Sequence, residues 1–269
     1  MQPHLGGHEV RPTTQGMSRI IAVASQKGGV GKTTTAINLG ACLAQESRHV
    51  LLVDIDPQAN ATSGLGVNGN DQRLTIYEAV IGQIELSQCI IPTALASLDL
   101  APASQRLSGA EVELVGMMAR ETKLKACLAT VSSKYDFIIL DCPPSLGLLT
   151  VNALTAADSV LIPLQCEYLA LEGLTSLLSA IRLVQDNLNQ GLRIEGVLLT
   201  MFDARLNLSQ QVADEARKFF AERVYKTAIP RNVRLSEAPS FGKPIVLYDS
   251  QSSGAESYRA LATEVMSHA

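Results

Sequence analysis

The sequence predicts a three-layer α/β fold, in which helices cover both faces of a mostly parallel, twisted β-sheet. Three observations support this prediction. Short β-rich apolar runs alternate with longer segments of helical periodicity, which is typical of βαβ units. Several of these runs are apolar at consecutive positions, as strands covered on both faces require. The chain has 269 residues, 46% of them hydrophobic, which is enough for one sizeable core.

Seven runs are expected to be strands, and right-handed crossovers between them place helices on both faces of the sheet. In chain order they are residues 19–25, 49–55, 98–103, 135–141, 159–165, 193–200 and 224–229. Helical periodicity marks five further segments, which are 32–46, a longer pattern around 108–132, 170–188, 208–223 and 255–268. Ligands of such a sheet bind outside the carboxyl ends of its strands, so functional residues are expected in the segments that follow the runs.

A single domain is expected over residues 18–269. Residues 1–17 lack the apolar centre of a secretory signal and are expected to form a disordered tail. The chain has no window of the roughly eighteen uninterrupted apolar residues that a membrane helix needs. Its five cysteines stand singly, without a CxxC pair, which favours reduced thiols and a cytoplasmic protein.

A glycine-rich turn, SQKGGVGKTT, follows the first run and opens the first helical segment. Glycines let backbone N–H groups turn toward a phosphate chain, and the helix N-terminus adds positive charge. Lys32 is expected to neutralise the β- and γ-phosphates of ATP, and the Thr33 hydroxyl to coordinate Mg²⁺. The residues expected to bind nucleotide in this turn are Lys27, Gly28, Gly29, Val30, Gly31, Lys32, Thr33 and Thr34.

The turn departs from the ordinary phosphate-loop pattern, because Gln26 stands where a glycine is expected and Lys27 follows it. The segment KGGVGKT resembles the deviant Walker A motif of the ParA/MinD group of ATPases. The resemblance implies a P-loop NTPase fold and an ATP-bound dimer whose two subunits face each other. In that family the extra lysine contacts the phosphates of the other subunit. Lys27 is therefore expected to be catalytic in trans, as an arginine finger is elsewhere, together with Lys32.

Acidic residues follow two other runs. Asp141 ends the apolar run 135–141 as a Walker B acid does, and is expected to hold Mg²⁺ through a water. In the family, the second aspartate of the DxDPQ motif orients or deprotonates the attacking water, so the resemblance gives Asp56 this catalytic role. Asp54 is either an outer partner of the Mg²⁺ or a strand cap. The amides of Gln58 and Asn60 either contact phosphate or the partner subunit, or are ordinary turn residues.

Two loops in the carboxyl-terminal third emerge where a nucleotide is expected. IPRNVRLSEAPSFGKPI is close to the same segment in the chromosomal ParA (Soj) subgroup, and the resemblance spans roughly residues 18–267. It implies that Pro230 and Asn232, and less directly Met201, contact the adenine.

The charge distribution suggests a partner. Seven basic and four acidic residues give the segment 203–234 a charge of +3, although the whole chain carries −4. A local basic face can attract DNA phosphates without reading base sequence. In the family, arginines at the positions of Arg205 and Arg234 contact DNA. Further candidates, for which a solvated surface is the alternative, are Lys218, Arg223 and Lys243.

Together these features predict a slow, Mg²⁺-dependent ATP hydrolase of the DNA-segregation type. The resemblance implies an ATP-bound homodimer that binds double-stranded DNA nonspecifically on the nucleoid. A ParB-like centromere-binding partner is then expected to stimulate hydrolysis and so release the DNA.

Three alternative functions each require a feature that the sequence does not show. A MinD-like membrane-associated ATPase needs a basic amphipathic tail, whereas the end, AESYRALATEVMSHA, has one arginine and is expected to pack on the domain. An iron–sulfur ATPase of the nitrogenase-reductase type needs paired cysteines in glycine-rich loops, and Cys142 is instead expected to pack in the core. A ParA-type repressor carries a helix-turn-helix domain before the phosphate loop, for which the residues before the first run leave no room.

Overall fold

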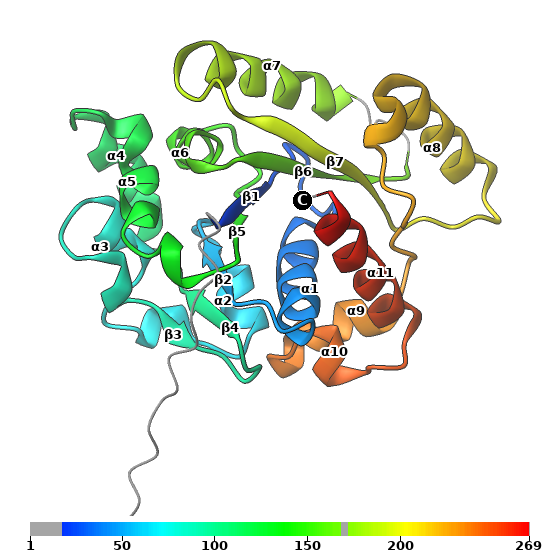
Figure 1. Ribbon diagram of the computed structural model, residues 1–269, viewed down its shortest axis with the longest axis horizontal. Coiled ribbons are helices and arrows are strands. Elements are labelled where there is room, and N and C mark those ends of the chain that lie inside the picture. The colour runs from blue at the N-terminus through cyan, green and yellow to red at the C-terminus, as the bar shows by residue number, and fades with distance from the viewer. Residues whose placement is uncertain (1–17, 168–171, 269) are drawn as a thin grey trace, which may run out of the picture.

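The computed structural model describes residues 18–167 and 172–268, so the tail predicted at 1–17 lies outside the described residues. Its sheet has the strand order β3-β4-β2-β5-β1-β6-β7 (Figure 1). Every neighbouring pair is parallel except β3 and β4, which are antiparallel. The strands are β1 (Arg19–Val23), β2 (Val50–Asp54), β3 (Ile91–Pro92), β4 (Leu98–Ala101), β5 (Phe137–Asp141), β6 (Ser159–Gln165) and β7 (Arg193–Thr200).

Helices connect the strands and cover both faces of the sheet, and Figure 1 shows α7 on one side of β6 and β7, with α1 and α11 on the other. The α-helices are α1 (Lys32–Gln45), α2 (Asn60–Gly64), α3 (Ile76–Val80), α4 (Leu107–Val115), α5 (Lys123–Ala129), α6 (Leu148–Ala156), α7 (Glu172–Asn187), α8 (Asn207–Phe220), α9 (Val233–Glu237), α10 (Ile245–Tyr248) and α11 (Ser253–Ser267). Short 3₁₀ turns are Gly69–Asp71, Leu86–Gln88, Arg120–Thr122, Ser132–Lys134, Ala221–Arg223 and Ala238–Phe241.

Alternate residues of each central strand enter two different hydrophobic clusters, one on each face of the sheet. On β2, Leu51 and Val53 pack in the cluster formed with α3 to α8. Val50 and Leu52 pack in the cluster formed with α1, α2 and α9 to α11. This division follows from the two-residue repeat of a strand and explains why the strands are apolar at every position. The predicted three-layer fold is confirmed.

One predicted strand is wrong. The segment 224–229 makes only isolated bridges beside β7, not a continuous ladder. The backbone N–H groups of Tyr225 and Ile229 donate to β7. The backbone N–H of Thr227, which lies between these two residues, donates instead to the Glu264 carboxylate of α11, at 3.1 Å. Because this donor is diverted, the segment runs alongside the sheet without becoming its eighth strand.

Other differences are smaller. The helical pattern around 108–132 is two helices, α4 and α5, because the chain breaks between them at Ala119, which has a left-handed φ of 51°. Helix α6 and the two-residue strand β3 were not predicted. Most residues of α6 are buried on all sides, including Asn152 and Thr155, so its sequence has no polar face to mark it as a helix.

Candidate active site

The turn from β1 into α1 has the backbone that a phosphate chain requires. Gly29 and Gly31 have φ of 73° and 89°, in the left-handed region that only glycine adopts at low cost. Thr200, the last residue of β7, donates its hydroxyl to the Val30 carbonyl at 2.8 Å. This hydrogen bond ties the turn to β7, the last strand of the sheet.

A cleft of about 470 Å³ opens above this turn, at the carboxyl ends of the central strands. A second cavity of about 350 Å³ shares Gly31, Thr34 and Met201 with the cleft and extends it toward α9 and α11. The cleft is lined by Gly28, Gly29, Gly31, Lys32, Thr33, Thr34, Ile37, Asn38, Asp56, Gln58, Asn60, Ser63, Pro144, Met201, Ala238, Pro239 and Lys243. An elongated groove over a glycine-rich turn suits a nucleoside triphosphate.

Lys32 is held inside the cleft. Its ammonium donates to the Lys27 carbonyl at 3.1 Å, and the residue is 7% exposed. Burial lowers the pKa of Lys32, while the carboxylates of Asp141 and Asp56 are among the groups that oppose this change. A buried ammonium with one backbone acceptor and carboxylates nearby is positioned for phosphate oxygens.

Asp54 and Asp56 follow β2 and are connected to each other. The buried Asp54 carboxylate accepts hydrogen bonds from the Asp56 N–H at 3.2 Å and from both the N–H and hydroxyl of Thr62, at 2.8 and 2.7 Å. Burial raises the pKa of Asp54 to about 6, and the hydrogen bonds from Thr62 oppose the rise. Asp56 lines the cleft and accepts from the Gln58 N–H at 2.9 Å. Asp54 therefore caps the strand and fixes the start of α2, while Asp56 faces the ligand space.

Asp141, at the end of β5, is the residue that most clearly lacks a partner. It is fully buried, and neither carboxylate oxygen has a hydrogen bond within residues 18–167 and 172–268. Burial raises the pKa of Asp141 well above its usual range, and the adjacent Asp54 carboxylate adds to the effect, while the nearby Thr33 hydroxyl and Lys32 oppose it. Unpartnered carboxylate oxygens near the Thr33 hydroxyl and Lys32 form the oxygen-rich donor set that Mg²⁺ prefers. The residues fit this ion.

The predicted adenine contacts lie together at the other end of the groove. Met201, Pro230 and Asn232 all line the second cavity, together with Ile229 and Tyr258. The Asn232 side chain caps α9, because its Oδ1 accepts from the Arg234 N–H at 2.8 Å, and its Nδ2 donates to the Ser253 hydroxyl at 2.8 Å. These contacts fix the cavity wall between α9 and α11.

Lys27 behaves differently from Lys32. Its side chain is half-buried and borders a small hollow at the carboxyl end of β6, beside Pro163 and Leu164. The structure therefore places this predicted catalytic lysine beside the cleft of its own chain and not among the residues that line it.

Some cleft residues were missed by sequence reasoning. Asn38 lies on α1 and donates to the Thr34 carbonyl at 2.8 Å, while its oxygen accepts from the Ile245 N–H at 2.7 Å. A buried asparagine within an otherwise apolar helix face was the available signal. Pro239 and Ser63 also line the cleft. Pro239 lies within the segment IPRNVRLSEAPSFGKPI, but nothing in its own residue type marked it as a cleft residue.

Comparisons with known proteins agree with this geometry. A family model described as an AAA domain matches residues 18–194. The sporulation initiation inhibitor protein Soj of Bacillus subtilis is 60% identical over 249 residues, covering 93% of this chain and 98% of Soj. The chromosome partitioning protein ParA of Myxococcus xanthus is 57% identical over 250 residues, covering 93% and 88%.

The chain belongs to the ParA/Soj family of chromosome-partitioning ATPases. The predicted family and the ATPase class are thus confirmed. Among solved structures, cobyrinic acid a,c-diamide synthase of Mycobacterium smegmatis, with bound ADP and magnesium, is 38% identical, with a TM-score of 0.84 over 94% of this chain and 95% of that one. Its nucleotide and metal agree with the predicted cofactors, ATP and Mg²⁺.

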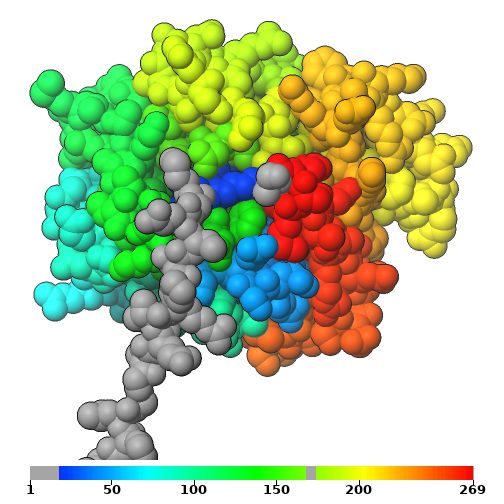
Figure 2. Space-filling view, viewed as in Figure 1, coloured from blue at the N-terminus to red at the C-terminus, as the bar shows by residue number. Residues whose placement is uncertain are grey.

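The basic residues predicted for DNA in this ParA/Soj chain are exposed but do not form one cluster. Lys218 and Arg223 lie on and just after α8, which forms a projecting corner in Figure 2. Lys243 is exposed and lines the nucleotide cleft. Arg205 forms an ion pair with Asp203, and Arg234 forms ion pairs with Glu237 and Asp249.

The carboxyl-terminal helix α11 packs on the ParA/Soj domain, as predicted. Tyr258, Leu261 and Val265 are buried, and the Tyr258 hydroxyl lies 3.2 Å from that of Thr35 on α1. Figure 2 shows α11 (red) lying against α1 (blue). In the part of the chain that the structure describes, none of the helices combines the length and apolar character needed to cross a bilayer.

The cysteines of this ParA/Soj chain are free, and only Cys127 is not fully buried. Cys142 is fully buried in the core, as predicted, and burial raises the pKa of its thiol.

Proposed function

We propose that the chain is a DNA-segregation ATPase that uses ATP as the bridge of a homodimer. In the ATP-bound state two subunits face each other across their clefts and bind double-stranded DNA without sequence preference. A ParB-like partner stimulates hydrolysis, and the dimer then separates and leaves the nucleoid. The membership in the ParA/Soj family supports this function, and the position of Lys27 is the observation that carries the dimer.

Each group in the cleft has a role in this proposal. The glycine-rich turn and Lys32 hold the triphosphate by N–H groups and positive charge. Thr33 and Asp141 would hold Mg²⁺, which neutralises phosphate charge when it is bound. Asp56 accepts a hydrogen bond from the attacking water and orients it, and the base lies beside Met201, Pro230 and Asn232.

Lys27 acts on the second subunit. Its side chain lies beside its own cleft, at the end of β6, so it is available to a partner that approaches this edge of the sheet. An ammonium delivered to the transferring phosphoryl group stabilises the charge that develops there, as an arginine finger does. Because each site is completed by the other copy, ATP binding and dimer formation support each other.

Gel filtration tests the proposal. The Asp56→Ala variant should bind ATP without hydrolysing it, so it should elute as a dimer with ATP and Mg²⁺ and as a monomer with ADP. The trapped dimer, but not the ADP form, should then bind an arbitrary DNA duplex. Elution at one position with both nucleotides would reject the nucleotide-bridged dimer. Equal DNA binding with ATP and with ADP would reject the proposal that hydrolysis releases the DNA.

A further inference from the structure

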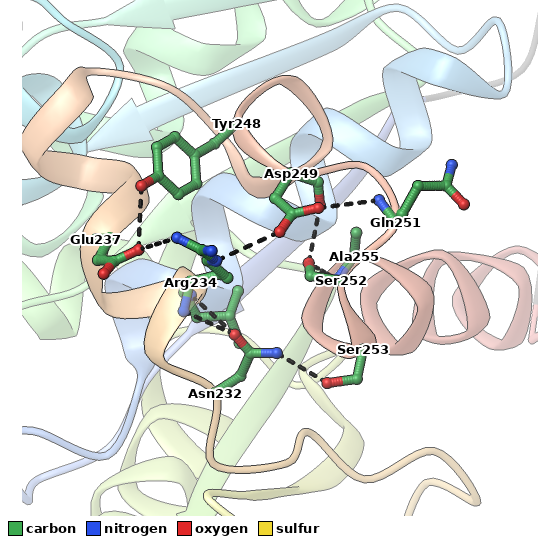
Figure 3. A network of polar contacts seen from close by, with 10 residues as sticks. Asn232, Arg234, Glu237, Tyr248, Asp249, Gln251, Ser252, Ser253 and Ala255 are labelled. Carbon is green, nitrogen blue, oxygen red and sulfur yellow. Dashed lines mark hydrogen bonds and ion pairs between the residues drawn. The ribbon is translucent and has the colours of Figure 1, made fainter.

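The two arginines proposed to contact DNA are both already paired with carboxylates. Arg205 makes a bidentate contact with Asp203, at 2.9 Å from Nε and 2.7 Å from Nη2. Arg234 donates from Nη1 to Glu237 at 2.9 Å, and its Nε lies 3.5 Å from Asp249 (Figure 3). Bidentate and bridged geometries of this kind match those that an arginine makes with phosphate.

The acceptors around Arg234 are held in place by other contacts. The Tyr248 hydroxyl donates to the same oxygen of Glu237 at 3.0 Å, and the Asp249 carboxylate accepts from the Gln251 N–H at 3.3 Å (Figure 3). Arg234 and Tyr248 both lower the pKa of Glu237, which therefore stays ionised at neutral pH. The arginine nevertheless keeps 55% of its side chain exposed, so a phosphate can reach it from solvent.

We propose that carboxylates of the chain compete with DNA phosphates for these arginines and so set the affinity for DNA. Glu237 and Asp249 compete for Arg234, and Asp203 competes for Arg205. This inference rests on the proposed function. A phosphate that takes the Nη1 or Nε donor of Arg234 displaces a fixed carboxylate, which then takes up a cation from solution. A phosphate that binds the remaining donors must share the positive charge of the arginine with that carboxylate. The net release of counterions is smaller than the number of arginines indicates, so binding is weaker and less salt-dependent than that of an unpaired basic surface.

The competition keeps the ATP-bound dimer only loosely attached to DNA. An intramolecular acceptor lowers the free energy gained at each phosphate contact without removing the contact. The chain can therefore bind anywhere on a duplex and still dissociate after hydrolysis. The chemistry it recognises is the phosphodiester backbone of double-stranded DNA.

The Glu237→Gln variant tests the inference, because glutamine retains the shape and an acceptor oxygen for Tyr248 and Arg234 but carries no charge. Glu222→Gln is the matched control. It removes the same charge from the 3₁₀ turn Ala221–Arg223, where the described residues give Glu222 no ion pair. Affinity for a DNA duplex is measured by fluorescence anisotropy with ATP and Mg²⁺ over a range of salt, and gel filtration verifies that each variant still dimerises.

Glu237→Gln should bind DNA about three- to fivefold more tightly than Glu222→Gln at physiological salt, which is the range of an exposed ion pair. The slope of log affinity against log salt should be larger in magnitude for Glu237→Gln than for Glu222→Gln, by up to about 0.9. In the Arg234→Ala background the two variants should be equal, because the competitor no longer has an arginine to occupy.

Equal affinities of Glu237→Gln and Glu222→Gln in the unmodified background would overturn the inference alone. A gain from Glu237→Gln that persists after Arg234→Ala would also overturn it, since the effect would then be general electrostatics. If the unmodified protein binds no DNA with ATP, the proposed function fails as well.

Discussion

Asp141 and Asp54 lie opposite each other at the ends of β5 and β2, and both are fully buried. Asp54 has three hydrogen-bond donors to stabilise its charge. In the described residues neither oxygen of Asp141 has a partner at full hydrogen-bond geometry, and only the nearby Thr33 hydroxyl and Lys32 oppose the rise in its pKa. Burial of an unpartnered carboxylate costs free energy of folding, and such a cost is typical of a site built for a ligand. At the scale of the residue, the cleft is therefore destabilised until nucleotide and metal arrive.

Replacing this carboxyl group should stabilise the empty protein. Asp141→Asn removes the buried charge, so the free energy of unfolding in EDTA should rise by roughly 1–3 kcal/mol while ATP hydrolysis is lost. Urea denaturation and a phosphate-release assay measure the two effects. A variant that is less stable than the unmodified protein in EDTA would contradict this account of Asp141.

The burial of Asp54 and Asp141 also predicts that the stability of the metal-free protein depends on pH. Burial raises the pKa of Asp54 to about 6 in the folded chain, above the value of about 3.9 of an unfolded aspartate, so the folded state binds more protons between these values. Stability without metal should therefore fall as the pH rises from about 4 to above 6. Asp141 contributes in the same direction, because its pKa is also raised.

Urea denaturation at several pH values in EDTA checks this prediction. The fall should be smaller in Asp141→Asn, which has lost one of the two groups and the repulsion it exerts on the other. A fall of equal size in both proteins would show that these carboxyl groups do not cause it.

At the scale of the element, α2 and the 3₁₀ turn Ala238–Phe241 meet through two glycines. Gly66, just after α2, has φ of 80°, and Gly242, just after the turn, has φ of 63°. A Cβ at Gly242 would lie 2.4 Å from the Cα of Gly66, so any side chain there must push the two segments apart. This contact positions Pro239 at the wall of the cleft and connects α2, which follows Asp56, with α9, which carries Arg234.

Gly242→Ala should therefore lower the free energy of unfolding by roughly 2–4 kcal/mol, since it adds steric overlap to an unfavourable φ. Gly82→Ala is the matched control. Gly82, like Gly242, has a positive φ, which is 80°, but a Cβ at Gly82 would meet open space. The cost of Gly82→Ala should be only about 1 kcal/mol. Chemical denaturation compares the two, and equal costs would mean that the segments can separate freely.

The elements also show what the sequence could predict. The central strands and the phosphate turn were predictable, because continuous apolar runs and a glycine-rich motif are local signals. The segment 224–229 has a strand-like sequence but is prevented from completing a ladder by Glu264, which is distant in the sequence. Asn38 and Pro239 reach the cleft only through the tertiary fold. The ion pair of Arg234 with Asp249 depends likewise on the packing of α9 against the segment after α10, whereas its pair with Glu237 lies within α9.

At the scale of the whole molecule, the charge pattern predicts how DNA binding responds to salt. An acidic chain with a few exposed arginines should bind DNA through a small number of phosphate contacts. Arg205→Ala and Arg234→Ala should each weaken binding for all sequences alike. Each should reduce the slope of log affinity against log salt by less than about 0.9, because the carboxylate paired with the arginine takes up a cation when DNA binds. Titrations of one duplex at four salt concentrations measure affinity and slope, and an unchanged affinity would remove that arginine from the contact surface.

The central claim is that each site uses its own Asp56 and the Lys27 of the other subunit. ATP hydrolysis by an equimolar mixture of Lys27→Ala and Asp56→Ala tests this claim most directly. Each variant alone should be inactive. The mixture should regain about a quarter of the unmodified rate, because half of the dimers are mixed and each mixed dimer has one complete site. If Lys27 instead served its own cleft, no mixed dimer would contain a complete site, and a mixture as inactive as its components would contradict the account.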